Sequence, residues 1–198
     1  MPFQLNEFRN QLQFDGARPN LFEVQITPPG FAGGPSTAGG VSDITKKTTF
    51  MCNAAQLPGS TLGIAPTYYF GREVKLAGNR TFADWTVTIL NDEDFLIRNM
   101  MERWMDGMGS NAENLRRPSA AALAGANTYA VDAYVTQFKK TGTTKSFEIA
   151  KEYTIVGMFP IDISPIDLAW SSNDQVEEFQ VTFALQHWED SFGLSVAR

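Results

Sequence analysis

The chain of 198 residues contains a single cysteine, Cys52, and a single histidine, His187. One cysteine cannot form an intramolecular disulfide, and one histidine cannot build a multi-histidine metal site. Cys52 has no histidine near it and lies in a strand-like pattern, so we interpret it as a buried, inert thiol. His187 alternates with Leu185 and Phe183, which indicates a partly buried structural residue without a catalytic role.

The chain also lacks a basic cluster and a long hydrophobic run. Sixteen Lys and Arg against 22 Asp and Glu give a formal net charge of −6, which argues against a surface that grips nucleic-acid phosphates. No stretch of about 18 apolar residues is present to span a bilayer. The N-terminus lacks the basic and apolar regions of a secretory signal. We therefore expect a soluble intracellular protein.

Possible catalytic or metal-binding motifs have simpler explanations. Residues 92–94 are acidic but do not have the spacing of an EF-hand loop, and they suit the first turn of a helix. Asp162 and Asp167 could form the carboxylate pair of a glycoside hydrolase, but no second feature supports it. The glycines of residues 28–42 match no phosphate-binding motif. We predict that the chain is not an enzyme and has no cofactor or metal; a carbohydrate-active β-sandwich is the enzymatic alternative.

Alternation of apolar and polar residues dominates the chain and is typical of β-strands. Strand-like segments cover residues 20–27, 48–55, 67–76, 80–90, 128–138, 146–156, about 166–170 and 175–188. Turn residues at 77–79 predict a hairpin between 67–76 and 80–90, and further turns are predicted at 140–142 and 171–174. Because turns rather than helical crossovers join the strands, we predict a mainly β, antiparallel barrel or sandwich with one flanking helix.

The predicted helix lies in residues 92–105. Apolar residues from Ile97 to Trp104 follow the i, i+3, i+4, i+7 spacing of one helix face. Asn91 or Asp92 is the expected N-cap.

Two stretches show no periodicity. Residues 28–42 contain five Gly and three Pro, which predicts a long loop; we extend this insertion to residues 28–46. Residues 107–127 form a second predicted loop, with a short helical turn at 119–123. With these insertions, residues 1–198 are expected to form a single domain.

Four of the predicted strands have one apolar face and one polar face that carries no Lys or Arg. Acidity is also concentrated toward the end of the chain, because residues 152–197 contain eight acidic residues and no basic one. We interpret the polar faces as the wall of a shared passage whose negative charge keeps a polyanion from sticking. An ordinary solvated sheet face is the alternative. The candidate lumen residues are Asp84, Thr86, Thr88, Asp132, Thr136, Glu148, Glu152, Glu178, Gln180 and Thr182.

Five segments occur in order along the chain: GARPNLFEVQI at 16–26, the strand ending in Cys52 with Leu57-Pro58-Gly59 after it, AGNRTFADWTVTILNDEDF at 77–95, LAW at 168–170, and QVEEFQVTFAL at 175–185. Together they resemble the tail tube proteins of contractile-tailed bacteriophages. The resemblance spans residues 16–189. The 77–95 segment is the most specific part.

This resemblance implies a subunit of hexameric rings that stack into the inner tube of a contractile tail and conduct DNA into the host. The implied partners are other copies of the chain, the tail sheath protein, a baseplate tube initiator and a tape measure protein. DNA would pass through the lumen without sequence-specific binding, and no membrane is involved. The implied location is the virion tail, assembled in the host cytoplasm. The tube of a type VI secretion system or of a phage-derived contractile particle is the alternative.

The segment after residue 56 carries apolar residues that would be costly to expose on a lone monomer. Within the implied tube, we predict that it forms the contact between rings. The residues concerned are Leu57, Pro58, Gly59, Leu62, Ile64, Tyr68 and Tyr69. The insertions 28–46 and 107–127 are expected on the tube exterior or at ring junctions.

Overall fold

The computed structural model describes residues 5–12, 16–32, 40–113, 115, 129–143 and 146–190. The helices are α1 (Leu5–Gln11), α2 (Gly40–Met51) and α3 (Leu96–Met108). The strands are β1 (Phe22–Ile26), β2 (Cys52–Ala55), β3 (Ser60–Tyr69), β4 (Arg72–Phe82), β5 (Trp85–Leu90), β6 (Val131–Thr143), β7 (Ser146–Ile163), β8 (Glu178–Ala184) and β9 (His187–Asp190).

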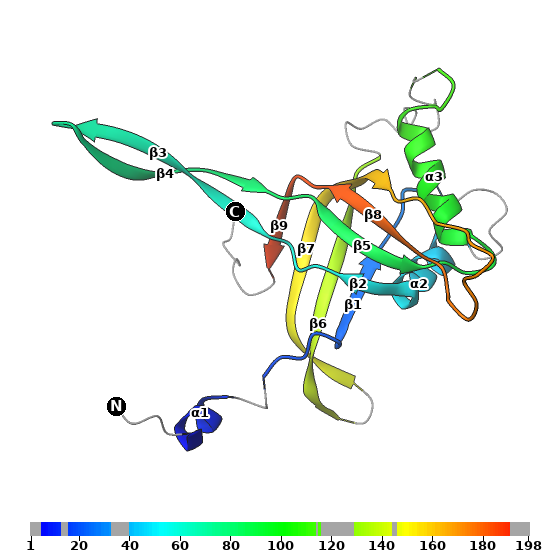
Figure 1. Cartoon of the computed structure of the whole chain (residues 1–198), viewed down its shortest axis with the longest axis horizontal. Coiled ribbons are helices and arrows are strands. Elements are labelled where there is room, and N and C mark those ends of the chain that lie inside the picture. Colours follow the sequence, from blue (N-terminus) through cyan, green and yellow to red (C-terminus); the bar gives the residue numbers. More distant parts are fainter. Residues whose placement is uncertain are drawn as a thin grey trace.

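Seven strands form one curved antiparallel sheet in the order β1-β6-β7-β8-β5-β2, and β9 pairs with β7 (Figure 1). The long strand β7 holds this sheet together, because its first part pairs with β6 and β9 and its last part with β8. The predicted mainly antiparallel β fold is confirmed.

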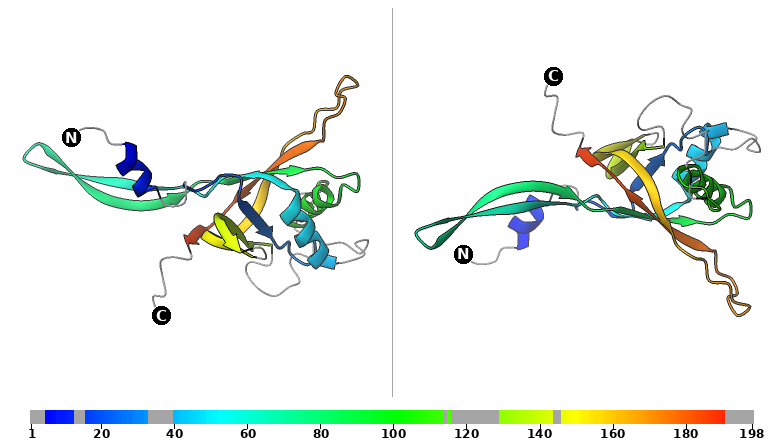
Figure 2. Two further views of the ribbon diagram at one scale, coloured as in Figure 1. Left: turned by 90° about the horizontal axis from the view of Figure 1, so that it is seen from below. Right: turned by 90° about the horizontal axis from the view of Figure 1, so that it is seen from above.

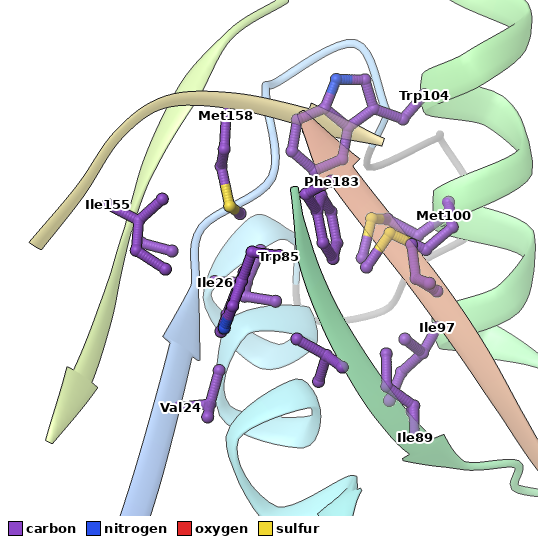
Figure 3. Close-up of a cluster of buried hydrophobic side chains, with 14 of the residues drawn as sticks. Val24, Ile26, Trp85, Ile89, Ile97, Met100, Trp104, Ile155, Met158 and Phe183 are labelled. Atoms are coloured by element: carbon purple, nitrogen blue, oxygen red, sulfur yellow. The ribbon is translucent and has the colours of Figure 1, made fainter. Parts of the chain in front are cut away.

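The core lies between this sheet and the helices α2 and α3. Strand β5 buries Trp85, Val87 and Ile89, and β8 buries its alternate residues from Phe179 to Phe183. The rings of Trp85 and Phe183 lie 5.7 Å apart at the centre of the core (Figure 3). Alternation therefore identified the inward faces of these strands correctly.

Helix α3 buries the predicted face, including Ile97 and Trp104, but it begins later than predicted. The residue before its first turn is Phe95, in the left-handed region with φ of 50°. Asp92 instead accepts a hydrogen bond from the Glu93 amide and lies 2.6 Å from Lys47 of α2. The prediction of Asn91 or Asp92 as N-cap is wrong, because this segment forms a turn that is tied to α2.

Helix α2 occupies a region predicted as the end of a loop (28–46) and the start of a strand (48–55). The threonine-rich sequence mimics a strand, but hydroxyls stabilise the helix: Thr48 Oγ1 donates to the Ile44 carbonyl at 2.8 Å, and Thr49 Oγ1 to that of Thr45 at 2.9 Å. Such bonds let a helix bury threonine without an unpaired polar group. Residues 33–39 of the predicted loop lie outside the described residues.

Strands β3 and β4 form a two-stranded ribbon that projects from the body (Figures 1 and 2). Its turn is at Phe70 and Gly71, both with positive φ, as a two-residue hairpin turn requires. The turn predicted at 77–79 is wrong. Gly78 lies in a bulge of β4, where a Cβ would come within 3.0 Å of the Gly63 backbone, so this glycine permits close strand approach.

Three further boundaries differ from the prediction. Strand β6 continues through the turn predicted at 140–142, and residues 166–170 are not a strand. The predicted strand 175–188 is divided into β8 and β9. Residues 107 and 108 belong to α3 rather than to the second loop, while the helical turn predicted at 119–123 lies outside the described residues.

Candidate lumen face and assembly surfaces

A row of polar residues crosses strands β5, β8 and β7 on the side of the sheet opposite the core. Thr86 pairs with Thr182, which pairs with Asp162 of β7, and the two threonine hydroxyls lie 3.3 Å apart. In the next row Thr88 pairs with Gln180. The strand register thus places four of the predicted lumen residues side by side.

A similar face covers the other half of the sheet, where β1, β6, β7 and β9 lie side by side. Thr136 of β6 pairs with Glu23 on one side and with Glu152 on the other. In the neighbouring row Thr154 pairs with Glu189 of β9. Acidic residues of β1, β7 and β9 therefore lie on this half of the sheet, with threonine hydroxyls between them.

We call these two sets of rows, together with Glu178 two residues before Gln180 on β8, the polar face. Its acidic members are Glu23, Glu152, Asp162, Glu178 and Glu189, and none of the residues in its rows is Lys or Arg. Glu178 accepts a hydrogen bond from Asn53 Nδ2 at 2.8 Å. Of the ten predicted lumen residues, the polar face contains Thr86, Thr88, Thr136, Glu152, Glu178, Gln180 and Thr182.

The other three predicted lumen residues lie outside these rows. Glu148 lies between two register shifts of the β6–β7 pair, one of them a bulge in β7, and it is 3.3 Å from Lys139, with which it forms an ion pair. Asp132 Oδ1 accepts a hydrogen bond from the Gly157 amide at 2.8 Å, so the Asp132 side chain links β6 to β7. Asp84 is in the connection between β4 and β5. The alternation of residues in the sequence could not reveal the bulge. One extra residue in a strand reverses the face of the sheet on which the side chains beyond it lie.

The hairpin β3–β4 exposes the apolar residues predicted for contact between rings. The exposed side chains include Leu62, Ile64, Tyr68 and Tyr69, and the structure adds Phe70, which is 92% exposed at the tip. At the base of the hairpin, the Gly59 carbonyl accepts a hydrogen bond from Trp188 Nε1 at 3.1 Å. Leu57, Pro58 and Gly59 therefore form the base of the hairpin, and the other predicted contact residues lie along β3.

A second exposed apolar segment, the loop of residues 164–177, was not singled out from the sequence. It connects β7 to β8 and projects from the end of the molecule opposite the hairpin (Figure 2). Trp170 is fully exposed at its far end, with Leu168 and Val176 also exposed. A recess of about 370 Å³ lies within this loop. The isolated tryptophan in a turn-rich segment was the available sequence signal.

Among the described residues, no group of side chains forms a metal-binding site. In the described part of the chain, no three His, Cys, Asp or Glu residues are grouped so that they could hold a metal ion. Cys52 is only partly buried, not buried as predicted, yet burial raises the pKa of its thiol to about 12, which keeps it protonated. His187 is half-exposed, and its Nε2 lies 3.3 Å from Glu189 Oε1. None of the described helices has the length and apolar character that a membrane crossing requires.

Comparison with known proteins identifies the family. The family model for phage tail tube proteins matches residues 17–191. The chain belongs to the phage tail tube protein family. This tube protein is 31% identical over 175 residues to tail tube protein gp19 of Enterobacteria phage T4, with 88% of this chain and 92% of the T4 protein covered. The tail tube protein gp19 of Enterobacteria phage T6 shows the same identity and coverage.

Two solved structures share the fold of this tube protein at low sequence identity. The tube-terminating cap of the anti-feeding prophage gives a TM-score of 0.57 with 14% identity, and 90% of this chain and 92% of that chain are covered. The sheath-tube complex of the extracellular contractile injection system PVC gives 0.53 with 11% identity, covering 95% and 97%. At these identities the likeness concerns the fold alone.

Family membership confirms several predictions made from the sequence. The tube protein is a structural component of a contractile phage tail and of the virion, and it is not an enzyme. The enzymatic alternative, a carbohydrate-active β-sandwich, is thereby set aside. The alternative of a secretion-system tube is supported only by shared fold, whereas the relatives with the higher identity are phage proteins.

Proposed function

We propose that six copies of the tube protein close into a ring, that rings stack into a tube, and that the polar face lines the lumen through which DNA leaves the virion. The observation that carries this proposal is the acidic, base-free composition of the polar face. The five acidic residues of this face, multiplied by six copies, would place about thirty negative charges around each ring.

This arrangement explains how a tube can conduct DNA without retaining it. Each phosphate neutralised by a basic side chain releases counterions and strengthens DNA binding. A wall of carboxylates, hydroxyls and amides offers no such partner, so DNA slides past without sequence-specific contact. The same logic requires that the basic side chains stay on other surfaces. Lys47, for example, is paired with Asp92 and Asp94 beside α3.

The assembly requires partners besides the tube protein itself. We infer that the tail sheath surrounds the tube, that a baseplate protein initiates it and that a tape measure protein occupies it during assembly in the host cytoplasm. The occurrence of sheath and tube in one complex in the PVC injection system supports the first of these. Apolar residues on the hairpin β3–β4 would be buried between rings, which removes the cost of exposing them.

Charge reversal on the polar face tests the proposal. The double variant Glu152→Lys with Thr182→Lys changes two exposed or half-exposed positions of the polar face and introduces a binding partner for phosphate. We expect tubes of normal appearance by electron microscopy but slower DNA ejection from virions, with recovery as salt is raised.

Asp43→Lys is the matched control, because Asp43 is exposed on α2, away from the polar face. Ejection from this control should be normal. If the polar-face variant ejected DNA at the normal rate, the polar face would not line the lumen. If the purified tube protein formed neither rings nor tubes even with baseplates present, the tube assembly itself would be excluded.

A further inference from the structure

Two exposed apolar segments of the tube protein project from opposite ends of the molecule. The hairpin β3–β4 extends along the long axis from one end, and the loop 164–177 leaves the other end (Figures 1 and 2). Each segment carries a nearly or fully exposed aromatic side chain, Phe70 on the hairpin and Trp170 on the loop. A single copy cannot bring these segments together, so neither can cover the other within one chain.

The two segments carry charges of opposite sign. The hairpin has three basic residues, Arg72, Lys75 and Arg80, and one acidic residue, Glu73, which gives it a net charge of +2. The loop 164–177 has three acidic residues and no basic one, which gives −3; they are Asp167, Asp174 and Glu177. Opposite charges on two surfaces favour their encounter and fix their register.

The recess in the loop is large enough to take the aromatic tip of the hairpin. At the tip of the hairpin, Tyr69 and Phe70 form an edge-to-face pair with ring centroids 4.7 Å apart, so the tip is a compact aromatic wedge. The loop contains the recess of about 370 Å³, whose lining includes Leu168 and Val176. This volume lies in the range of small-molecule pockets and is ample for an aromatic ring. Desolvated aromatic anchors seated in pockets are the usual centres of protein interfaces.

We propose that the hairpin tip of one tube protein seats in the recess of loop 164–177 of a second copy. Phe70 fills the recess, and Arg72 and Lys75 face the carboxylates of Asp167 and Asp174. This inference rests on the proposed tube assembly and deepens it by naming both halves of the contact between successive rings. Because the two surfaces lie at opposite ends, the contact repeats head to tail and gives the assembly a direction.

Chemical crosslinking between two single-cysteine variants tests the pairing. In a Cys52→Ala background, Phe70→Cys and Val176→Cys proteins are mixed, assembled and treated with a short bismaleimide. We expect a crosslinked dimer from the mixture and none from either variant alone. The matched control replaces Phe70→Cys by Phe50→Cys, which is 81% exposed on α2, and should give no dimer with Val176→Cys.

A charge swap provides a second measurement that does not depend on cysteine. Arg72→Glu and Asp167→Lys should each raise the protein concentration needed for half-assembly by at least about fivefold. The double variant should recover most of this loss, because the reversed charges attract again. Both residues are exposed, so each variant is expected to fold normally, which circular dichroism checks.

The outcomes separate this contact from the tube itself. A mixed dimer together with rescue by the double variant supports the pairing. If the wild-type protein forms tubes but the mixture of Phe70→Cys and Val176→Cys shows no crosslinking above the Phe50→Cys control, and the charge-swapped double variant shows no rescue, the pairing is overturned and the tube assembly stays in place. Absence of rings and tubes from the wild-type protein, with baseplates added, overturns both.

Discussion

Trp85 offers the sharpest test of how the core of the tube protein is held together. Its side chain is 1% exposed and lies against Phe183 in the centre of the core (Figure 3). Its indole Nε1 donates a hydrogen bond of 2.7 Å to the Gln56 carbonyl, where the chain leaves β2 toward the hairpin. One residue therefore both fills the core and anchors the base of the hairpin.

The variant Trp85→Phe removes both contributions while keeping an aromatic ring. Loss of the hydrogen bond, which leaves a carbonyl without its donor, costs about 1 kcal/mol. Loss of the larger ring leaves a partial cavity, and by comparison with large-to-small core substitutions this costs about 1–2 kcal/mol. We expect the free energy of unfolding to fall by about 2–3 kcal/mol, with an unchanged dependence on urea concentration.

Urea denaturation followed by far-UV circular dichroism measures this change, at a concentration where sedimentation finds only monomers. Trp170→Phe is the matched control, since it makes the same replacement at a fully exposed position and should change stability by less than about 0.5 kcal/mol. Equal effects of the two variants would refute the assignment of Trp85 to the core.

Three further predictions follow from contacts elsewhere in the chain. Because the pKa of Cys52 is about 12, at pH 9 its thiolate fraction is roughly a thousandth, and iodoacetamide should label the native protein far more slowly than the urea-unfolded protein. Gly157→Ala should destabilise the fold by about 1–2 kcal/mol, since Gly157 has φ of +64° and a Cβ would lie 2.9 Å from a neighbouring side chain; Gly30→Ala, in open space, is the control for the same denaturation assay. Lys47→Met should cause a small loss of stability at neutral pH that disappears in 1 M NaCl. The loss of stability should also fade in acid, because the ion pair with Lys47 lowers the pKa of Asp92. A carboxyl group with a lowered pKa stabilises the fold at pH values above its ordinary pKa. This stabilisation is lost as the pH falls through the lowered pKa.

The sequence allowed most of the inward and outward faces to be predicted, but not the positions where the chain changes direction. Alternation in β5 and β8 identified Trp85, Val87 and Phe183 as core because both strands pair without a bulge. Helix α2 was missed because β-branched residues are typical of strands. The hydrogen bonds from the hydroxyls of Thr48 and Thr49 to helix carbonyls depend on the packing of the folded protein, which the sequence pattern does not show.

The candidate surfaces were predictable to a similar extent. The polar rows of β5 and β8 followed from alternation, whereas Glu148 is displaced by a bulge that leaves no mark in the sequence. The hairpin turn was placed at residues 77–79 because glycine beside asparagine is a strong turn signal. The actual turn at Phe70 and Gly71 has only one glycine, and the exposed aromatic residue tolerates a positive φ. Loop 164–177 has no regular periodicity, so its recess depends on tertiary structure.

The attachment of the hairpin has a mechanical consequence. Ten residues of β3 at about 3.3 Å each make an arm of roughly 33 Å. Trp188 is one of its contacts with the body: the indole Nε1 donates a hydrogen bond to the Gly59 carbonyl, and the ring packs against Phe82. A rotation of 10° at this pivot would move the tip by about 6 Å, calculated from that strand length. We expect the hairpin to act as a lever that absorbs changes in the twist between rings while the core stays rigid. Flexing of the tube would then be concentrated at one pivot in each subunit.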